Sequence, residues 1–258
     1  MSFRFLLPLA IALALPAQDQ RPPGAGINFY SLDDEVALGA QLADTVRKNT
    51  YPVHNPAVQD YVTRLGKQLA AQSGGPDFSY TFSVISDAIP IDLTHEPIAL
   101  PGGPIFVHTG LILEARSESE FAGMLAHAIA HVAERHYTRN MTRSNLMQIG
   151  AIAAAQSMPN GAQPIPLGTL QFQRAFELQA DWLAVQMLSK AGYDPAALAT
   201  YVQRTQTHQP GSISQVFSPL PPVRERAAAI QKAAAAAPGQ TNGSGAEFAA
   251  IQDALRGK

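Results

Sequence analysis

The sequence has 258 residues, of which 46% are hydrophobic and 15% are charged, which is the composition of a globular protein with a packed core. Its formal net charge of −2 excludes the basic footprint of a nucleic-acid-binding protein and a strongly acidic tail. It contains no cysteine, which excludes disulfides and thiolate ligands, so any metal site must use His, Asp or Glu.

The N-terminus has the pattern of a secretion signal. Arg4 precedes an uninterrupted apolar run over 5–15, and Pro16-Ala17 then leads into polar residues. The run is too short to span a bilayer comfortably. We therefore predict a signal peptide over 1–17, with a retained N-terminal anchor as the alternative. Cleavage after Ala17 would leave an exported protein, periplasmic or secreted, with no transmembrane span in the mature chain.

The mature chain begins with a predicted flexible leader over 18–30, which is rich in Pro and Gly. Ser31 and Asn55 are candidate caps for two helices with apolar stripes. Aromatic and small polar residues alternate over 78–85, which predicts a half-buried strand, and a second strand is predicted over 104–110. Gly102 and Gly103 precede the second strand, and they allow the backbone to approach another group closely.

The second half of the chain is predicted to be helical. Ser117 and Glu120 form a capping-box signature at the start of a long helix. We predict helices over 118–136, 145–157, 172–190, 194–205, after Pro222 and over 247–255. One domain over 31–235 is expected, followed over 236–258 by a linker and a short C-terminal helix.

Two pairs of polar residues have the spacing of a metal site. His127 and His131 are four apart in one predicted helix, which puts both imidazoles on one face. Such pairs are usually ordinary surface or core residues, so this pair alone is weak evidence. Glu177 and Asp181 are also four apart, in an otherwise apolar helix. An inward-facing carboxylate there is unfavourable unless it is paired or metal-bound, although both acids could instead face solvent.

Several separated segments resemble, in the same order, the periplasmic and membrane zinc peptidases related to BepA, HtpX and the CAAX prenyl proteases. The resemblance covers about 31–226 and is carried by residues 99–111, 117–127, 131–136, 177–181 and 191–195. It implies a zincin-like α+β fold, mainly α, with a small sheet beside the metal helix. It also implies endoproteolysis of protein or peptide substrates, with misfolded envelope proteins as the expected class.

The resemblance also implies roles for individual residues. His127, His131 and Glu177 would bind one Zn²⁺ per chain, and Asp181 would orient a ligand histidine. Gly102 and Gly103 would border an edge strand along which an extended peptide could pair.

Ala128 departs from the family motif, which has Glu immediately after the first histidine. Zinc lowers the pKa of its bound water, but a base must still take the proton and deliver it to the leaving amine. A methyl group can do neither, and loss of a positioned acid or base costs about 10²–10⁴-fold in rate. Metal binding is expected to survive, because that Glu is not a ligand in the family motif.

A second departure is Leu220, which stands where the family often has a histidine that can approach the metal. His208 is a nearby alternative, but loop histidines are usually solvated. His136 follows His131 by five positions, which on a continuous helix turns it off the ligand face. We expect ordinary structural or solvated roles for the remaining histidines, His54, His95 and His108.

Three hypotheses follow for the function. The chain could be a peptidase scaffold that binds zinc and protein, with cleavage lost or strongly reduced. It could be a slow peptidase in which Glu134 or another acid supplies the base. It could also be a binding or chaperone-like module, with or without its zinc. The joint presence of His127, His131, Glu177 and Asp181 argues against loss of the metal and favours the first hypothesis.

Overall fold

The computed structural model describes residues 27–86, 96–155, 167–205, 221–237 and 245–257. The predicted signal peptide, His95, His208 and Leu220 lie outside these ranges. The helices are α1 (Leu32–Asn49), α2 (Pro56–Ala70), α3 (Thr109–Glu114), α4 (Glu118–Ala133), α5 (His136–Ala155), α6 (Leu167–Ala191), α7 (Ala197–Thr205), α9 (Val223–Ala236) and α10 (Ala246–Leu255). The strands are β1 (Tyr51–Pro52), β2 (Thr81–Ser86), β3 (Ile98–Ala99) and β4 (Pro104–His108).

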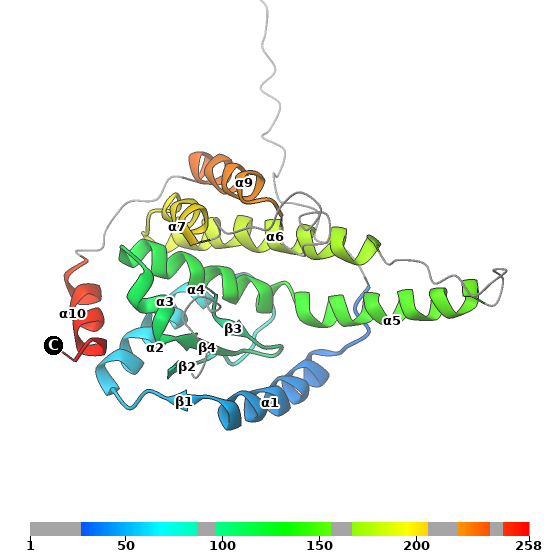
Figure 1. Ribbon diagram of the computed structural model, residues 1–258, viewed down its shortest axis with the longest axis horizontal. Helices are drawn as coiled ribbons and strands as arrows, with labels where there is room; N and C mark the ends of the chain where they lie inside the picture. Colours follow the sequence, from blue (N-terminus) through cyan, green and yellow to red (C-terminus); the bar gives the residue numbers. More distant parts are fainter. Residues whose placement is uncertain (1–26, 87–95, 156–166, 206–220, 238–244, 258) are drawn as a thin grey trace, which may run out of the picture.

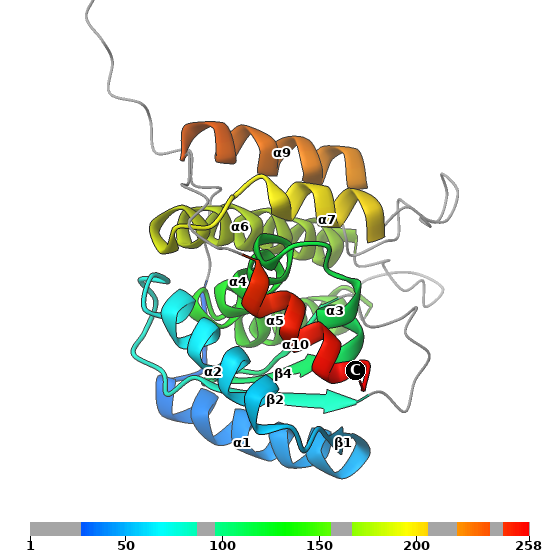
Figure 2. The same ribbon diagram turned by 90° about the vertical axis from the view of Figure 1, so that its left-hand side faces the viewer.

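The described chain is mainly helical with one small sheet, as predicted, and it is layered. Figures 1 and 2 show the sheet between α1 on one side and α2 and α4 on the other, with α6, α7 and α9 stacked beyond α4. The C-terminal helix α10 packs back onto this body, since the ring of Phe248 stacks on that of Phe121 at 5.6 Å. No helix within the described ranges is both long and apolar enough to cross a membrane.

The sheet has the order β1-β2-β4-β3. Its two central strands are parallel, with Thr81 opposite Pro104, and the outer strands β1 and β3 are antiparallel to their neighbours. Side chains of β4 alternate between the two faces: Ile105 and Val107 belong to the main core, whereas Phe106 packs towards α1 with Ala43. Both faces are therefore covered, and β3 is left at the edge of the sheet.

Helix starts follow the predicted caps. The Ser31 hydroxyl accepts from the Asp34 backbone, and Asn55 and Ser117 cap α2 and α4 in the same way. The predicted strand over 104–110 is shorter than expected, because α3 begins at Thr109.

The long helix predicted over 118–136 is broken, and this corrects the prediction. Helix α4 ends at Ala133, and Arg135 adopts a left-handed backbone with φ 59° before α5 begins at His136. Such a backbone is uncommon for a residue other than glycine and needs outside support. Glu35 of α1 supplies it by accepting from Arg135 Nε at 2.8 Å, and the Tyr30 carbonyl accepts from the same guanidinium.

Gly102 and Gly103 lie in the turn that joins the edge strand β3 to β4, with φ 75° and 123°. The close approach they allow is to protein backbone: added Cβ atoms would lie 2.5 Å from Val36 Cα and 2.7 Å from the Ser79 carbonyl. The turn is thereby seated between α1 and the segment before β2.

Gly39 provides a test of this packing. A Cβ on Gly39 would lie 1.8 Å from the Pro101 carbonyl oxygen, so Gly39→Ala must push α1 away from the β3–β4 turn. Alanine gains about 1 kcal/mol in helix propensity, but overpacking against backbone costs about 1–3 kcal/mol or more. We expect a lower free energy of unfolding in urea denaturation. Exposed Gln41→Ala, on the same helix, is the control, and equal stability of the two variants would contradict this packing.

Candidate metal centre

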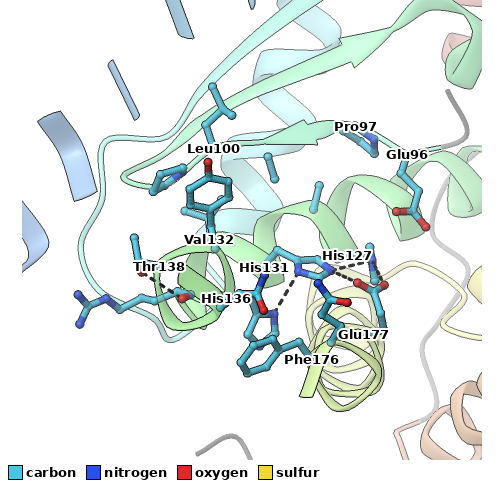
Figure 3. Close-up of a pocket in the computed structure, with 17 residues that line it drawn as sticks. Glu96, Pro97, Leu100, His127, His131, Val132, His136, Thr138, Phe176 and Glu177 are labelled. Carbon is cyan, nitrogen blue, oxygen red and sulfur yellow. Dashed lines mark hydrogen bonds and ion pairs between the residues drawn. The ribbon is translucent and has the colours of Figure 1, made fainter. Parts of the chain in front are cut away.

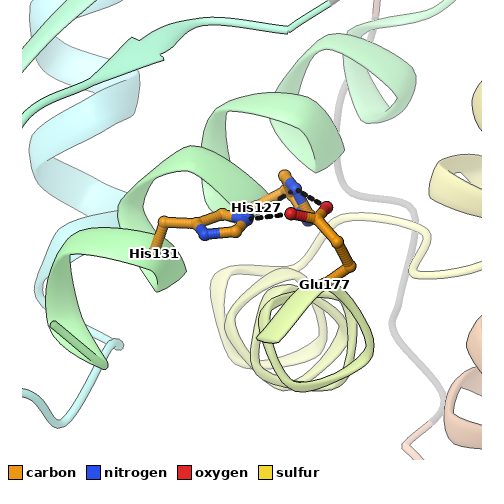
Figure 4. A group of neighbouring side chains, drawn as sticks. All are labelled: His127, His131 and Glu177. Carbon is orange, nitrogen blue, oxygen red and sulfur yellow. Dashed lines mark hydrogen bonds and ion pairs between the residues drawn. The ribbon is translucent and has the colours of Figure 1, made fainter. Parts of the chain in front are cut away.

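Helices α4 and α6 bring three side chains to one point, as Figure 4 shows. His127 and His131 lie one turn apart on α4, and Glu177 faces them from α6. The two Nε2 atoms are 3.0 Å apart, and each lies 3.5 Å from an oxygen of Glu177. One ligand atom from each residue falls within 4.8 Å of the others. This is the cluster expected from the sequence, brought together from positions 50 residues apart.

The chemistry of this cluster fits a divalent transition metal. Two imidazoles and a carboxylate are a common protein donor set for such an ion. Oε2 of Glu177 is buried without a hydrogen-bond partner among the described residues, which is costly unless a cation completes it. Burial raises the pKa of Glu177, but the two histidines outweigh burial and hold it well below its usual range, so the carboxylate is ionised, as a metal ligand must be.

Asp181 lies behind the first histidine, one turn after Glu177. Its Oδ1 is 2.9 Å from Nδ1 of His127, and its other contacts are to Arg226 of α9, whose Nε and Nη2 donate at 2.7 and 3.0 Å. All three residues are at most 1% exposed. Burial raises the pKa of Asp181, but the positive charge of Arg226 outweighs burial and lowers it. Burial lowers the pKa of His127, but the negative charge of Asp181 outweighs burial and raises it to about 9.

Arg226 was not expected at the site from the sequence. It belongs to an alanine-rich helix, where an arginine usually points to solvent. The signal that could have identified it is the apolar spacing of α9, since Ala227, Ile230 and Ala233 are buried on the same helix. Its guanidinium also reaches Glu96, 3.2 Å from Nη1.

His136 is not part of the cluster, as expected, but the helix is not continuous and His136 lies beside the second histidine rather than away from it. The break at Arg135 brings Nδ1 of His136 to 3.1 Å from Nδ1 of His131. Nε2 of His136 lies 3.1 Å from Oε1 of Gln179, and Gln179 donates to Glu134 at 2.7 Å. Burial and the neighbouring His131 lower the pKa of His136 well below its usual value.

A pocket of about 330 Å³ opens beside the cluster (Figure 3). Ala128 lines it together with His127 and His131, and Ala99 of the edge strand lies on its wall. Among the described residues that line it, the acidic ones are Glu96 and Glu177. Glu134 is not part of the lining, and Gln179 and His136 stand between it and His131, which counts against Glu134 as the catalytic base.

The remaining sequence candidates lie elsewhere. His54 is exposed, and His108 is buried at the end of β4; neither joins the cluster. Gly102 and Gly103 do not line the pocket; the residues of their hairpin that do are Ala99, Leu100 and Pro101.

Arg226→Leu is expected to destabilise the protein strongly at neutral pH. Removing one partner of a buried pair costs about 3–5 kcal/mol, and Asp181 would keep only its contact with His127. Exposed Arg224→Leu, on the same helix, should change the free energy of unfolding by no more than about 0.5 kcal/mol. Adding Asp181→Asn to Arg226→Leu should cost less than the sum of the single changes. Additive costs in urea denaturation would contradict direct coupling.

Comparison with known proteins agrees with this geometry. The sequence profile of peptidase family M48 matches residues 56–234, most of the chain, including the three cluster residues. The chain is 28% identical to a beta-barrel assembly-enhancing protease of Yersinia pestis, over 74% of this chain and 42% of that protein. It is 29% identical to the mitochondrial metalloendopeptidase OMA1 of Schizosaccharomyces pombe, over 69% of this chain and 53% of that protein.

A further relative is the metalloprotease LoiP of Escherichia coli, 26% identical over 68% of this chain and 71% of that protein. The chain thus spans about half or less of the length of the first two relatives. The family match, the metalloprotease relatives and the His-His-Glu cluster lead to one conclusion: the chain belongs to peptidase family M48, a family of metal-dependent proteases.

Proposed function

We propose that this chain is an exported zinc metalloendopeptidase scaffold that acts on misfolded envelope proteins, and that Ala128 leaves its cleavage strongly reduced. The observation that carries the proposal is the complete His127–His131–Glu177 cluster beside an alanine in the wall of the same pocket. Export is proposed from the N-terminal sequence, which favours a periplasmic location after signal-peptide cleavage. The substrate class is proposed from the name of the beta-barrel assembly-enhancing relatives.

Zinc is the proposed metal because two imidazoles, neutral once the metal has displaced the proton of His127, and one carboxylate leave an open position in a tetrahedral site. His127, His131 and Glu177 would hold it, with Asp181 orienting His127. Bound there, zinc would acidify a water molecule and polarise a peptide carbonyl.

Peptide binding is supported by the edge strand. β3 pairs with β4 through Ile98 opposite Phe106 and Ala99 opposite Ile105, and the neighbours Leu100 and Pro101 line the pocket with Ala99. An extended segment could add to this edge by main-chain hydrogen bonds. Such pairing needs an unfolded segment, which matches a preference for misfolded proteins. Gly102 and Gly103 would then act by seating the hairpin rather than by touching the substrate.

Ala128 removes the group that would move the proton. The reaction requires a base that takes a proton from the attacking water and passes it to the departing amine nitrogen as the peptide bond breaks. The methyl group of Ala128 has no atom that can accept it. Binding of metal and peptide uses other atoms, so the scaffold would retain both.

A zinc-containing binding or chaperone-like module is the second candidate, favoured by the same alanine. The two candidates differ in whether any metal-dependent cleavage remains, and protection of an unfolded protein from aggregation without cleavage would favour the module.

Ala128→Glu is expected to raise cleavage of unfolded casein about 10²–10⁴-fold over the original chain. The gain should vanish with a chelator and in the double variant Ala128→Glu/His131→Ala. Peptide bond cleavage is measured by release of labelled fragments. Equal rates with Ala and Glu at position 128 would mean that another group already serves as the base.

Metal analysis tests the site without reference to catalysis. The purified chain should hold one zinc ion, and His131→Ala and Glu177→Ala should each lower the zinc content at a fixed chelator concentration. His54→Ala, which changes an exposed histidine outside the cluster, is the matched control. Zinc content that is zero, or that His131→Ala leaves unchanged, would contradict the proposed site.

A further inference from the structure

We propose that Glu134, Gln179 and His136 form a hydrogen-bonded relay that positions His131 for metal binding by fixing which of its ring nitrogens carries the proton. The inference rests on the proposed role of His131 as a ligand. It assigns a function to three buried side chains: Glu134 at the end of α4, His136 at the start of α5, which also lines the pocket, and Gln179 on α6.

The direction of each hydrogen bond in the relay follows from Glu134, the member farthest from His131. The amide NH₂ of Gln179 donates to Oε2 of Glu134 at 2.7 Å, because an amide nitrogen can only donate. The amide oxygen of Gln179 is then turned towards Nε2 of His136, 3.1 Å away. Since that oxygen only accepts, Nε2 of His136 must carry a proton.

The proposed ligand role of His131 leads independently to the same protonation of His136. A ligand histidine binds through a nitrogen lone pair, and for His131 the nitrogen that faces His127 and Glu177 is Nε2. Its single proton therefore lies on Nδ1. The partner of that N–H, at 3.1 Å, is Nδ1 of His136, which must accept.

The contacts at both ends therefore require one tautomer of His136, with the proton on Nε2 and the lone pair on Nδ1. The doubly protonated ring would place an N–H against the N–H of His131. The tautomer with its proton on Nδ1 would clash with His131 in the same way and would leave Nε2 without a proton for Gln179. The relay thus permits one arrangement of protons, and that arrangement presents the Nε2 lone pair of His131 to the metal.

Burial shields the relay from water, and Arg139 is a charged neighbour of its far end, with Nη1 3.8 Å from Oε2 of Glu134. Gln179 is 1% exposed, His136 3% and Glu134 8%, so water cannot readily replace a member. The ring of His136 stacks on Phe176 at 4.4 Å, which holds its plane. Each ligand histidine is then oriented by a carboxylate: His127 directly by Asp181, and His131 through two intervening side chains.

The test compares zinc affinity in three proteins by competition with a chromophoric chelator. His136→Phe keeps an aromatic ring against Phe176 but cannot accept from His131, and we expect zinc affinity to fall about 10–100-fold. His136→Asn places a carbonyl oxygen near the position of Nδ1 and should restore affinity close to that of the original chain. A merely structural role for His136 predicts the reverse order, because Asn fills the ring's space poorly.

A second measurement does not depend on any variant. In the ¹⁵N-labelled, zinc-loaded protein, NMR of the imidazole nitrogens should show the proton of His136 on Nε2 and that of His131 on Nδ1. A proton on Nδ1 of His136, or affinity unchanged in His136→Phe, would overturn the relay while leaving the zinc site intact. Failure of the original chain to bind zinc would instead contradict the proposed function and, with it, the ligand role of His131.

Discussion

The buried ion pair between Asp181 and Arg226 constrains the arrangement of the whole site. It joins α6 to α9, and through His127 it also fixes α4. A buried pair adds little net stability, but leaving either charge without its partner is costly. The three helices can therefore adopt only placements in which both charges are satisfied. The same placement turns Glu177, one turn before Asp181 on α6, towards the two histidines.

In the proposed site, the residues that would hold a metal are distinct from the residue that would use it. The polar contacts that orient the cluster come from Asp181, Arg226, Gln179 and His136, and none of them involves the side chain at position 128. Ala128 lines the pocket, but it is only 2% exposed and also packs in the main core. The residue at position 128 and the polar groups that orient the cluster are therefore separate parts of the site.

Local signals made much of this predictable from the sequence. Caps at Ser31, Asn55 and Ser117 set helix starts through contacts within four residues, and the cluster followed from helical spacing together with the family resemblance. The break at Arg135 was not predictable, because neither Gly nor Pro marks it and its support comes from Glu35, 100 residues away. The position of His136 was missed for the same reason.

The left-handed residue at Arg135 also bears on the order in which the protein folds. Helix α4 can form early from local contacts, but His136 reaches His131 only when the turn between them is held by Glu35. Contacts between segments so distant in sequence close large loops and form late. The second histidine would therefore acquire its final orientation only after α1 has docked, so that a chain lacking its first helix would carry an unfinished His-His-Glu cluster.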